Sequence, residues 1–113
     1  MTTYQFGDVV LVDFPFSDRN AEKRRPGFVL AQDPHGDLLV ARISSKSAEF
    51  STDVSLIDWK TAGLNIPSTA RLLKLATTHQ SNVLRVLGTA SVADRQIVIS
   101  AFRAFLINLE STI

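Results

Sequence analysis

The chain has 113 residues, 45% of them hydrophobic, which suits one domain with a single core. Its 12 basic and 11 acidic side chains leave a net charge of +1, so the molecule is no polycation, and an anionic partner would have to meet a local basic patch. The absence of cysteine excludes disulfides, and two isolated histidines argue against a zinc centre. The start MTTYQFGD has no leader pattern, and no apolar run is long enough to span a membrane. We expect one soluble cytoplasmic domain over residues 1–113, without metal or other cofactor.

The first predicted element is a strand within the stretch GDVVLVDFPF, where apolar residues alternate. Its two faces would carry Val10, Val12, Phe14 and Phe16 on one side and Val9, Leu11 and Asp13 on the other. The next segment, Ser17 to Arg25, is polar and rich in cations, and Pro26 leads into a new apolar run. We expect a loop held between two strands, with Arg25 at the root of the second strand. Loops fixed in this way are typical places for ligand binding.

Five more elements are expected before residue 78. Gly27 to Ala31 and Leu38 to Ser44 are predicted strands of a hairpin, because the segment between them is dense in turn residues. A polar loop and a brief strand around Asp53 to Leu56 follow. Ile57 to Leu64 fits one helical turn closed by Gly63, and Ser68 to Thr77 fits a further strand.

The C-terminal part is predicted to be helical. Ser81 to Leu87 is expected to form a short helix that stops at Gly88, and Ser91 with Asp94 resembles a capping box at the start of a long helix. The helical spacing of its apolar residues predicts a stripe that belongs to the core, formed by Val98, Ala101, Phe102, Phe105, Leu106 and Leu109. The expected fold is mainly β with α (α+β), a small half-open barrel closed by the terminal helix.

Four segments together resemble the MazF/PemK family of type II toxin-antitoxin toxins. They are GDVVLVDFPFSD, RRPGFVL, IDWKTAGLNIPSTARL and LGTAS, in the order and spacing of that family over nearly the whole chain. The resemblance implies an SH3-like barrel, a homodimer, and a metal-independent endoribonuclease that cuts single-stranded RNA at selected sequences. It also implies an acidic antitoxin that occupies the RNA groove, with operator DNA bound only in complex with that antitoxin.

The same resemblance suggests roles for individual residues. Arg25 matches the arginine before the proline of the second strand and is the expected catalytic group. Ser44 falls where many members have threonine and is the second catalytic candidate. Arg71 matches an arginine suited to holding RNA phosphate. Apart from the resemblance, single-stranded RNA needs basic groups along its backbone, which makes Arg24 and Lys46, together with Ser45, the other RNA-binding candidates. The chain departs from some members at Leu73, where they have an acidic residue, and it lacks a histidine in the first loop.

Cutting RNA without a metal requires the ribose 2′-hydroxyl to attack the adjacent phosphate, which leaves a 2′,3′-cyclic phosphate and a 5′-hydroxyl. The site must position the phosphate, stabilise its added negative charge and transfer a proton. The planar guanidinium of Arg25 suits charge stabilisation, whereas arginine is a poor base. The sequence does not identify the group that accepts the 2′-hydroxyl proton.

Structural alternatives exist for each candidate. Arg24 and Arg25 would also fit a solvated loop that balances Asp18 and Glu22, Ser44 a local backbone hydrogen bond, and Arg71 an ion pair. Two other functions fit the same barrel: a toxin that binds a protein target such as DNA gyrase without nuclease activity, and a non-catalytic nucleic-acid-binding module. The near-neutral charge argues against strong unaided binding to duplex DNA.

Overall fold

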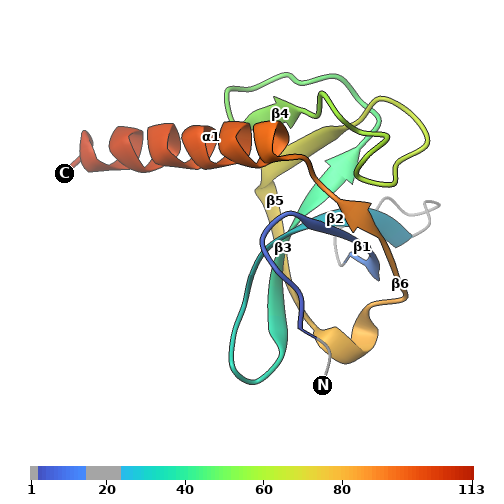
Figure 1. The fold of residues 1–113 in the computed structure, drawn as a ribbon. Coiled ribbons are helices and arrows are strands. Elements are labelled where there is room, and N and C mark those ends of the chain that lie inside the picture. Colours follow the sequence, from blue (N-terminus) through green and yellow to red (C-terminus); the bar gives the residue numbers. More distant parts are fainter. Residues whose placement is uncertain (1–2, 15–23) are drawn as a thin grey trace.

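The computed structural model describes residues 3–14 and 24–113. Within them, one antiparallel sheet has the strand order β4-β5-β3-β2-β1-β6, followed by one long helix (Figure 1). The elements are β1 (Asp8–Asp13), β2 (Arg24–Gln32), β3 (Asp37–Ser44), β4 (Asp53–Ser55), β5 (Thr69–His79), β6 (Arg85–Thr89) and α1 (Val92–Glu110). The described edge strands, β4 and β6, do not pair with each other, so the curved sheet forms a half-open barrel. The predicted mainly β, SH3-like class is confirmed.

The sheet is buried on both faces, because consecutive residues of its strands enter different clusters. One cluster contains Val10, Val12, Phe14, Val29, Leu38 and Val40, and we call this side of the sheet the Val12 face. The other cluster includes Val9, Phe28, Ala41, Ile43 and Leu72, and we call that side the Val9 face. The predicted alternation of the first strand is therefore confirmed, while Phe16 lies outside the described residues.

A bulge in β5 bends the sheet near the candidate site. Ala41 of β3 pairs with Leu75, but the next residue, Arg42, pairs with Arg71, so residues 72–74 are extra on β5. Such an insertion bends a strand and increases its twist, and Figure 1 shows the bend in β5. The first residues of β5 can consequently pair with both β3 and β4.

The predicted short helix at Ser81 to Leu87 is wrong. The structure has a single 3-10 turn at Gln80–Asn82 and then β6, which pairs with β1 along its outer edge. Pairing with a neighbouring strand overrides a weak local helical pattern. Gly88 is not a helix stop: a Cβ there would lie 2.7 Å from the backbone carbon of Ala62, so glycine allows a close backbone contact.

The turn predicted at Ile57 to Leu64 is confirmed. The amides of Gly63 and Leu64 each donate to the carbonyl oxygens of Lys60 and Trp59, respectively, at 3.0 Å. Gly63 has a φ of +83°, which a residue with a Cβ rarely adopts, and a Cβ would also collide with the carbonyl of Leu87. Residues 62–63 therefore pack closely against β6.

The start of α1 is anchored to this turn. Ser91 Oγ accepts a hydrogen bond from the Asp94 amide at 3.1 Å, as the capping pattern predicts. The Asp94 carboxylate is fully buried and accepts hydrogen bonds from the amides of Ile57 and Asp58, both at 2.9 Å. One side chain thus fixes both the helix and the turn.

The expectation that the apolar stripe of α1 belongs to the core is wrong beyond its first turns. Val98 is buried, but Leu106 and Leu109 are exposed. Figure 1 shows the reason: α1 projects away from the sheet, so its outer half has no strand beneath it. Between the helix and the sheet lies a groove of about 670 Å³, lined by Phe50, Ser51, Thr52, Leu73, Ala101, Ala104, Phe105 and Asn108.

Candidate functional site

The register of β2 and β3 brings two sequence-predicted residues to one face of the sheet. Gly27 of β2 pairs with Arg42 of β3. Arg25 lies two residues before Gly27 and Ser44 lies two residues after Arg42, and because the strands are antiparallel, both steps lead to the same end of the sheet. Because side chains alternate between faces, Arg25 and Ser44 both belong to the Val12 face at the same end of the sheet. Arg25 also pairs with Val12 itself, on β1.

The guanidinium of Arg25 retains most of its donors. Its Nη1 donates to the carbonyl oxygen of Arg24 at 2.8 Å, and the side chain is partly exposed, so it is not sealed in the core. No carboxylate among the described residues forms an ion pair with it. A guanidinium has five N–H groups, so the remaining donors are available to an anion.

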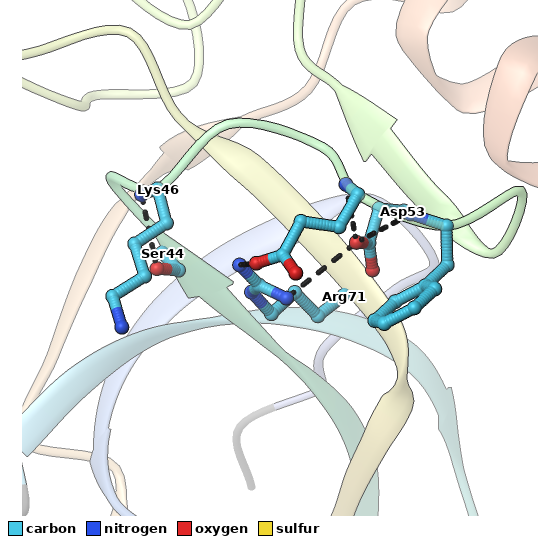
Figure 2. A network of polar contacts seen from close by, with 6 residues as sticks. Ser44, Lys46, Asp53 and Arg71 are labelled. Atoms are coloured by element: carbon cyan, nitrogen blue, oxygen red, sulfur yellow. Dashed lines mark hydrogen bonds and ion pairs between the residues drawn. The ribbon is translucent and has the colours of Figure 1, made fainter.

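Ser44 ends β3 and forms the local hydrogen bond that its position predicts. Its Oγ accepts from the Lys46 amide at 3.1 Å, as Figure 2 shows. Because the oxygen acts as the acceptor there, the hydroxyl hydrogen is still available to donate. Ser45 and Lys46 follow in an exposed loop, and no described carboxylate pairs with Lys46.

Arg71 is held between two carboxylates. Its Nη1 lies 3.5 Å from Asp53 Oδ2 and its Nη2 lies 3.6 Å from Glu49 Oε1 (Figure 2). The side chain of Arg71 is only 12% exposed. The ion-pair alternative is thus observed, and a direct contact of Arg71 with RNA stays a prediction.

Arg24 points away from Arg25. It pairs in register with Asp13, so its side chain belongs to the Val9 face, and its Nε lies 3.9 Å from Asp13 Oδ1. Both side chains are 63% exposed, and an ion pair so open to water contributes little. The side chains of the two neighbouring arginines therefore lie on opposite sides of the sheet.

Two cavities adjoin the site where β2 begins and β3 ends. The first, of about 400 Å³, includes Pro26, Ser45 and Arg85 in its lining, and the second, of about 170 Å³, includes Ser45 and Lys46. No acidic side chain among the described residues lines either cavity. Arg25 on the Val12 face, Lys46 in the loop after β3 and Arg85 on the Val9 face, where it pairs with Leu11, thus lie at one end of the sheet without a described acidic partner.

Three residues in this region were not predicted from the sequence. Arg42 lies on the Val12 face, paired with both Gly27 and Arg71, and its alternation with Ser44 was the available signal. Glu49 lies in the β3–β4 loop, and Arg71 comes directly before the β5 bulge. No pattern in the sequence predicts the contact between them. Arg85 was placed on a predicted helix, whereas it belongs to β6.

The two histidines belong to the far end of the sheet. His79 pairs with Asp37, at the opposite end of β3 from Ser44. Its Nδ1 lies 2.8 Å from Ser81 Oγ and its Nε2 lies 3.2 Å from the carbonyl oxygen of His35. In the part of the chain that the structure describes, no group of three metal-ligating side chains is found. No described helix is both long and apolar enough to cross a membrane.

The chain matches the model of a protein family over residues 5–106, and that family is described as PemK-like, MazF-like toxin of type II toxin-antitoxin system. The curated proteins, in contrast, yielded no match.

Several solved structures share the fold. An endoribonuclease in complex with its cognate antitoxin from a mycobacterial species has a TM-score of 0.71 at 14% identity, over 92% of this chain and 95% of that one. The Mycobacterium tuberculosis toxin MazF-mt6 has a TM-score of 0.67 at 20% identity, over 83% and 90%. MazF from Deinococcus radiodurans has a TM-score of 0.69 at 18% identity, over 94% and 98%.

Proposed function

This chain belongs to the PemK-like, MazF-like family of toxins from type II toxin-antitoxin systems, and we propose that it is a metal-independent endoribonuclease that cleaves single-stranded RNA. The observation that carries the proposal is the common face and common strand end of Arg25 and Ser44. Both side chains can donate hydrogen bonds, and no described carboxylate forms an ion pair with Arg25 or with Lys46. That combination suits a phosphodiester.

In the proposed reaction, the scissile phosphate lies against Arg25 and Ser44. Arg25 donates to the non-bridging oxygens and stabilises the charge that develops as the 2′-oxygen attacks. Ser44 donates its hydroxyl hydrogen to the same phosphate. The products are a 2′,3′-cyclic phosphate on one fragment and a 5′-hydroxyl on the other.

The rest of the RNA would follow the cations at this end of the sheet. Lys46 and Arg85 line the two cavities beside the strand ends, where they would contact neighbouring phosphates. Ser45 lines both cavities, and Arg24 and Arg85 would approach from the Val9 face, because they pair with Asp13 and Leu11. A strand that crosses the end of the sheet would meet all of them.

We propose a cognate antitoxin with an acidic extended segment as the second partner. A structural relative is an endoribonuclease in complex with its cognate antitoxin. In this chain, Arg25, Lys46 and Arg85 would attract acidic side chains as they attract phosphates, so the antitoxin and RNA would compete. Operator DNA would be bound only by the complex, because the toxin has a net charge of only +1.

The proposed assembly is a cytoplasmic homodimer that uses α1. The outer half of the helix exposes large apolar side chains such as Leu106 and Leu109 and borders the groove beside the sheet. A contiguous exposed apolar surface of this kind is typical of an interface. A second copy of the chain would cover both the helix and the groove.

The proposal is tested by incubating the protein with a long single-stranded RNA in EDTA and mapping both ends of every product. We expect cyclic phosphate and 5′-hydroxyl ends, and no cleavage of the same sequence as 2′-deoxy DNA. Products with 3′-hydroxyl and 5′-phosphate ends would refute the mechanism. No products across a broad set of RNA sequences would favour a toxin that binds a protein target such as DNA gyrase.

A further inference from the structure

The proposed cleavage needs a group that accepts the proton of the attacking 2′-hydroxyl, and neither Arg25 nor Ser44 suits that role. Arginine remains protonated in proteins, so it cannot take up a proton. A serine hydroxyl is itself a very weak base and depends on a separate general base in catalysis. The proton acceptor has to lie on the Val12 face, close to the end of β3. Few described side chains meet both conditions.

The histidines lie too far from the end of β3 to accept this proton. His79 pairs with Asp37, seven residues before Ser44 on β3. At a rise of about 3.3 Å per residue, the two ends of that segment are roughly 23 Å apart. Asp13 is excluded as the proton acceptor because it lies on the wrong face of the sheet: it pairs with Arg24, on the opposite side from Arg25.

Among the described residues, two carboxylates remain near the site, and their surroundings differ. The Asp53 side chain is only 4% exposed, and its Oδ2 accepts from the amides of Glu49 and Phe50 at 3.0 and 3.2 Å. The same oxygen faces Arg71. The hydrogen bonds of the Asp53 carboxylate therefore stabilise the β3–β4 loop. The Glu49 side chain in contrast is 61% exposed, and its Oε1 lies 3.6 Å from Arg71 Nη2.

We propose that Glu49 is the general base of this enzyme and that Arg71 is the positioning residue that holds its carboxylate beside the scissile phosphate. The inference rests on the proposed endoribonuclease function and completes its proton transfer. Ser44 pairs with Thr69, so Arg71 is its diagonal neighbour on the same face, roughly 7–8 Å away. The contact with Arg71 thus brings the Glu49 carboxylate to the same face of the sheet as Ser44.

The step balances without a co-reactant. A Glu49 oxygen takes the proton of the 2′-hydroxyl while the 2′-oxygen forms its bond to phosphorus, and the bond from phosphorus to the 5′-oxygen breaks. The leaving 5′-oxygen takes a proton from water, and the protonated Glu49 returns its proton to solvent. Asp53 keeps Arg71 in place throughout, because its Oδ2 lies 3.5 Å from Arg71 Nη1 whether or not the Glu49 side chain is protonated.

The decisive variant is Glu49→Gln, which keeps the shape of the side chain and removes its basicity. Single-turnover cleavage of RNA in EDTA is expected to slow by about 10²–10⁴-fold, the usual contribution of a general base. Binding of a 2′-O-methyl RNA of the same sequence, which cannot react, is expected to change by less than about twofold. Glu110→Gln, at the exposed end of α1, is the matched control and should cleave like the unaltered chain.

Chemical rescue separates a base from a structural carboxylate. Added formate should accelerate cleavage by Glu49→Ala, because the small anion can occupy the space of the missing group, and it should not accelerate Arg25→Ala. Cleavage by Glu49→Gln within a few-fold of the unaltered chain would overturn the assignment. Equal losses in rate and in binding of the 2′-O-methyl RNA would also overturn it. If the unaltered chain cleaved no RNA, the endoribonuclease proposal itself would fail, and the Glu49 assignment with it.

Discussion

At the scale of single residues, the site combines side chains whose hydrogen-bonding roles do not overlap. Arg25 offers several charged donors, and Ser44 offers one neutral donor whose oxygen is already fixed by the Lys46 amide. Fixing the oxygen orients the hydroxyl before any substrate arrives. A preoriented donor needs no reorganisation during the reaction, which is the main source of electrostatic catalysis.

Replacing the hydroxyl of Ser44 tests its proposed role. Ser44→Ala should lower the cleavage rate by roughly 10–100-fold, since a hydrogen bond to a charged group contributes about 1.5–3 kcal/mol. Ser44→Thr keeps the hydroxyl and should stay within a few-fold of the unaltered chain. Both rates are measured under single-turnover conditions with the same RNA. Equal rates for Ser44→Ala and Ser44→Thr would contradict the role.

The family resemblance singled out Arg25 and Ser44 as catalytic candidates, and local patterns placed both of them next to strand boundaries. Pro26 marks the root of one strand, and the hairpin fixes the end of the other. Glu49 was not found, because its contact with Arg71 depends on three extra residues in β5 and on a loop whose path the sequence does not encode locally. The alternation of side chains along a strand does not predict contacts that depend on a bulge.

At the scale of elements, the buried carboxylate of Asp94 couples α1 to the turn before β5. It satisfies two backbone amides from residues 57 and 58, and its own amide is satisfied by Ser91. Charged hydrogen bonds of this kind are strong, and their loss leaves buried donors without partners. The start of the helix and the turn should therefore unfold together.

Asp94→Ala is expected to lower the free energy of unfolding by about 3 kcal/mol, because two hydrogen bonds to a charged group are lost. Gln96→Ala, at an exposed position of the same helix, should change it by less than about 0.5 kcal/mol. Urea unfolding at one fixed protein concentration provides the comparison. A similar effect of both substitutions would show that Asp94 does not anchor the helix.

The elements themselves were predictable where a strong pattern and a cap coincide. The first strand, the hairpin and the start of α1 follow from alternation, turn residues and the Ser91 cap. β6 was not predictable locally, since five residues with a mixed pattern become a strand only because β1 offers an unpaired edge. Tertiary pairing decides such short segments.

At the scale of the molecule, α1 is the feature that the single chain leaves unexplained. The stripe that the sequence predicts as core is uncovered at Leu106 and Leu109, and the groove beside it is lined by five apolar and three polar residues. Sequence periodicity shows that a helix face is apolar but not which surface covers it. The proposed homodimer would cover the face with a second copy of the chain.

The dimer is tested by placing a charge in the groove. Ala104 is exposed and lines the groove, so Ala104→Glu should leave the folded chain intact and make its association unfavourable. Ala93→Glu, at an exposed position of the first turn, is the matched control and should stay dimeric. Light scattering at micromolar concentration measures both masses. A monomeric unaltered chain, or a dimeric Ala104→Glu, would contradict this interface.

The central claim is that Arg25 stabilises the charge that develops on an RNA phosphate. The most direct measurement compares single-turnover cleavage of one RNA in EDTA by the unaltered chain, by Arg25→Ala and by Arg103→Ala, an exposed arginine on α1. We predict a loss of about 10²–10³-fold for Arg25→Ala, comparable with the loss of one oxyanion-hole donor, and no loss for Arg103→Ala. Undiminished cleavage by Arg25→Ala would contradict the account.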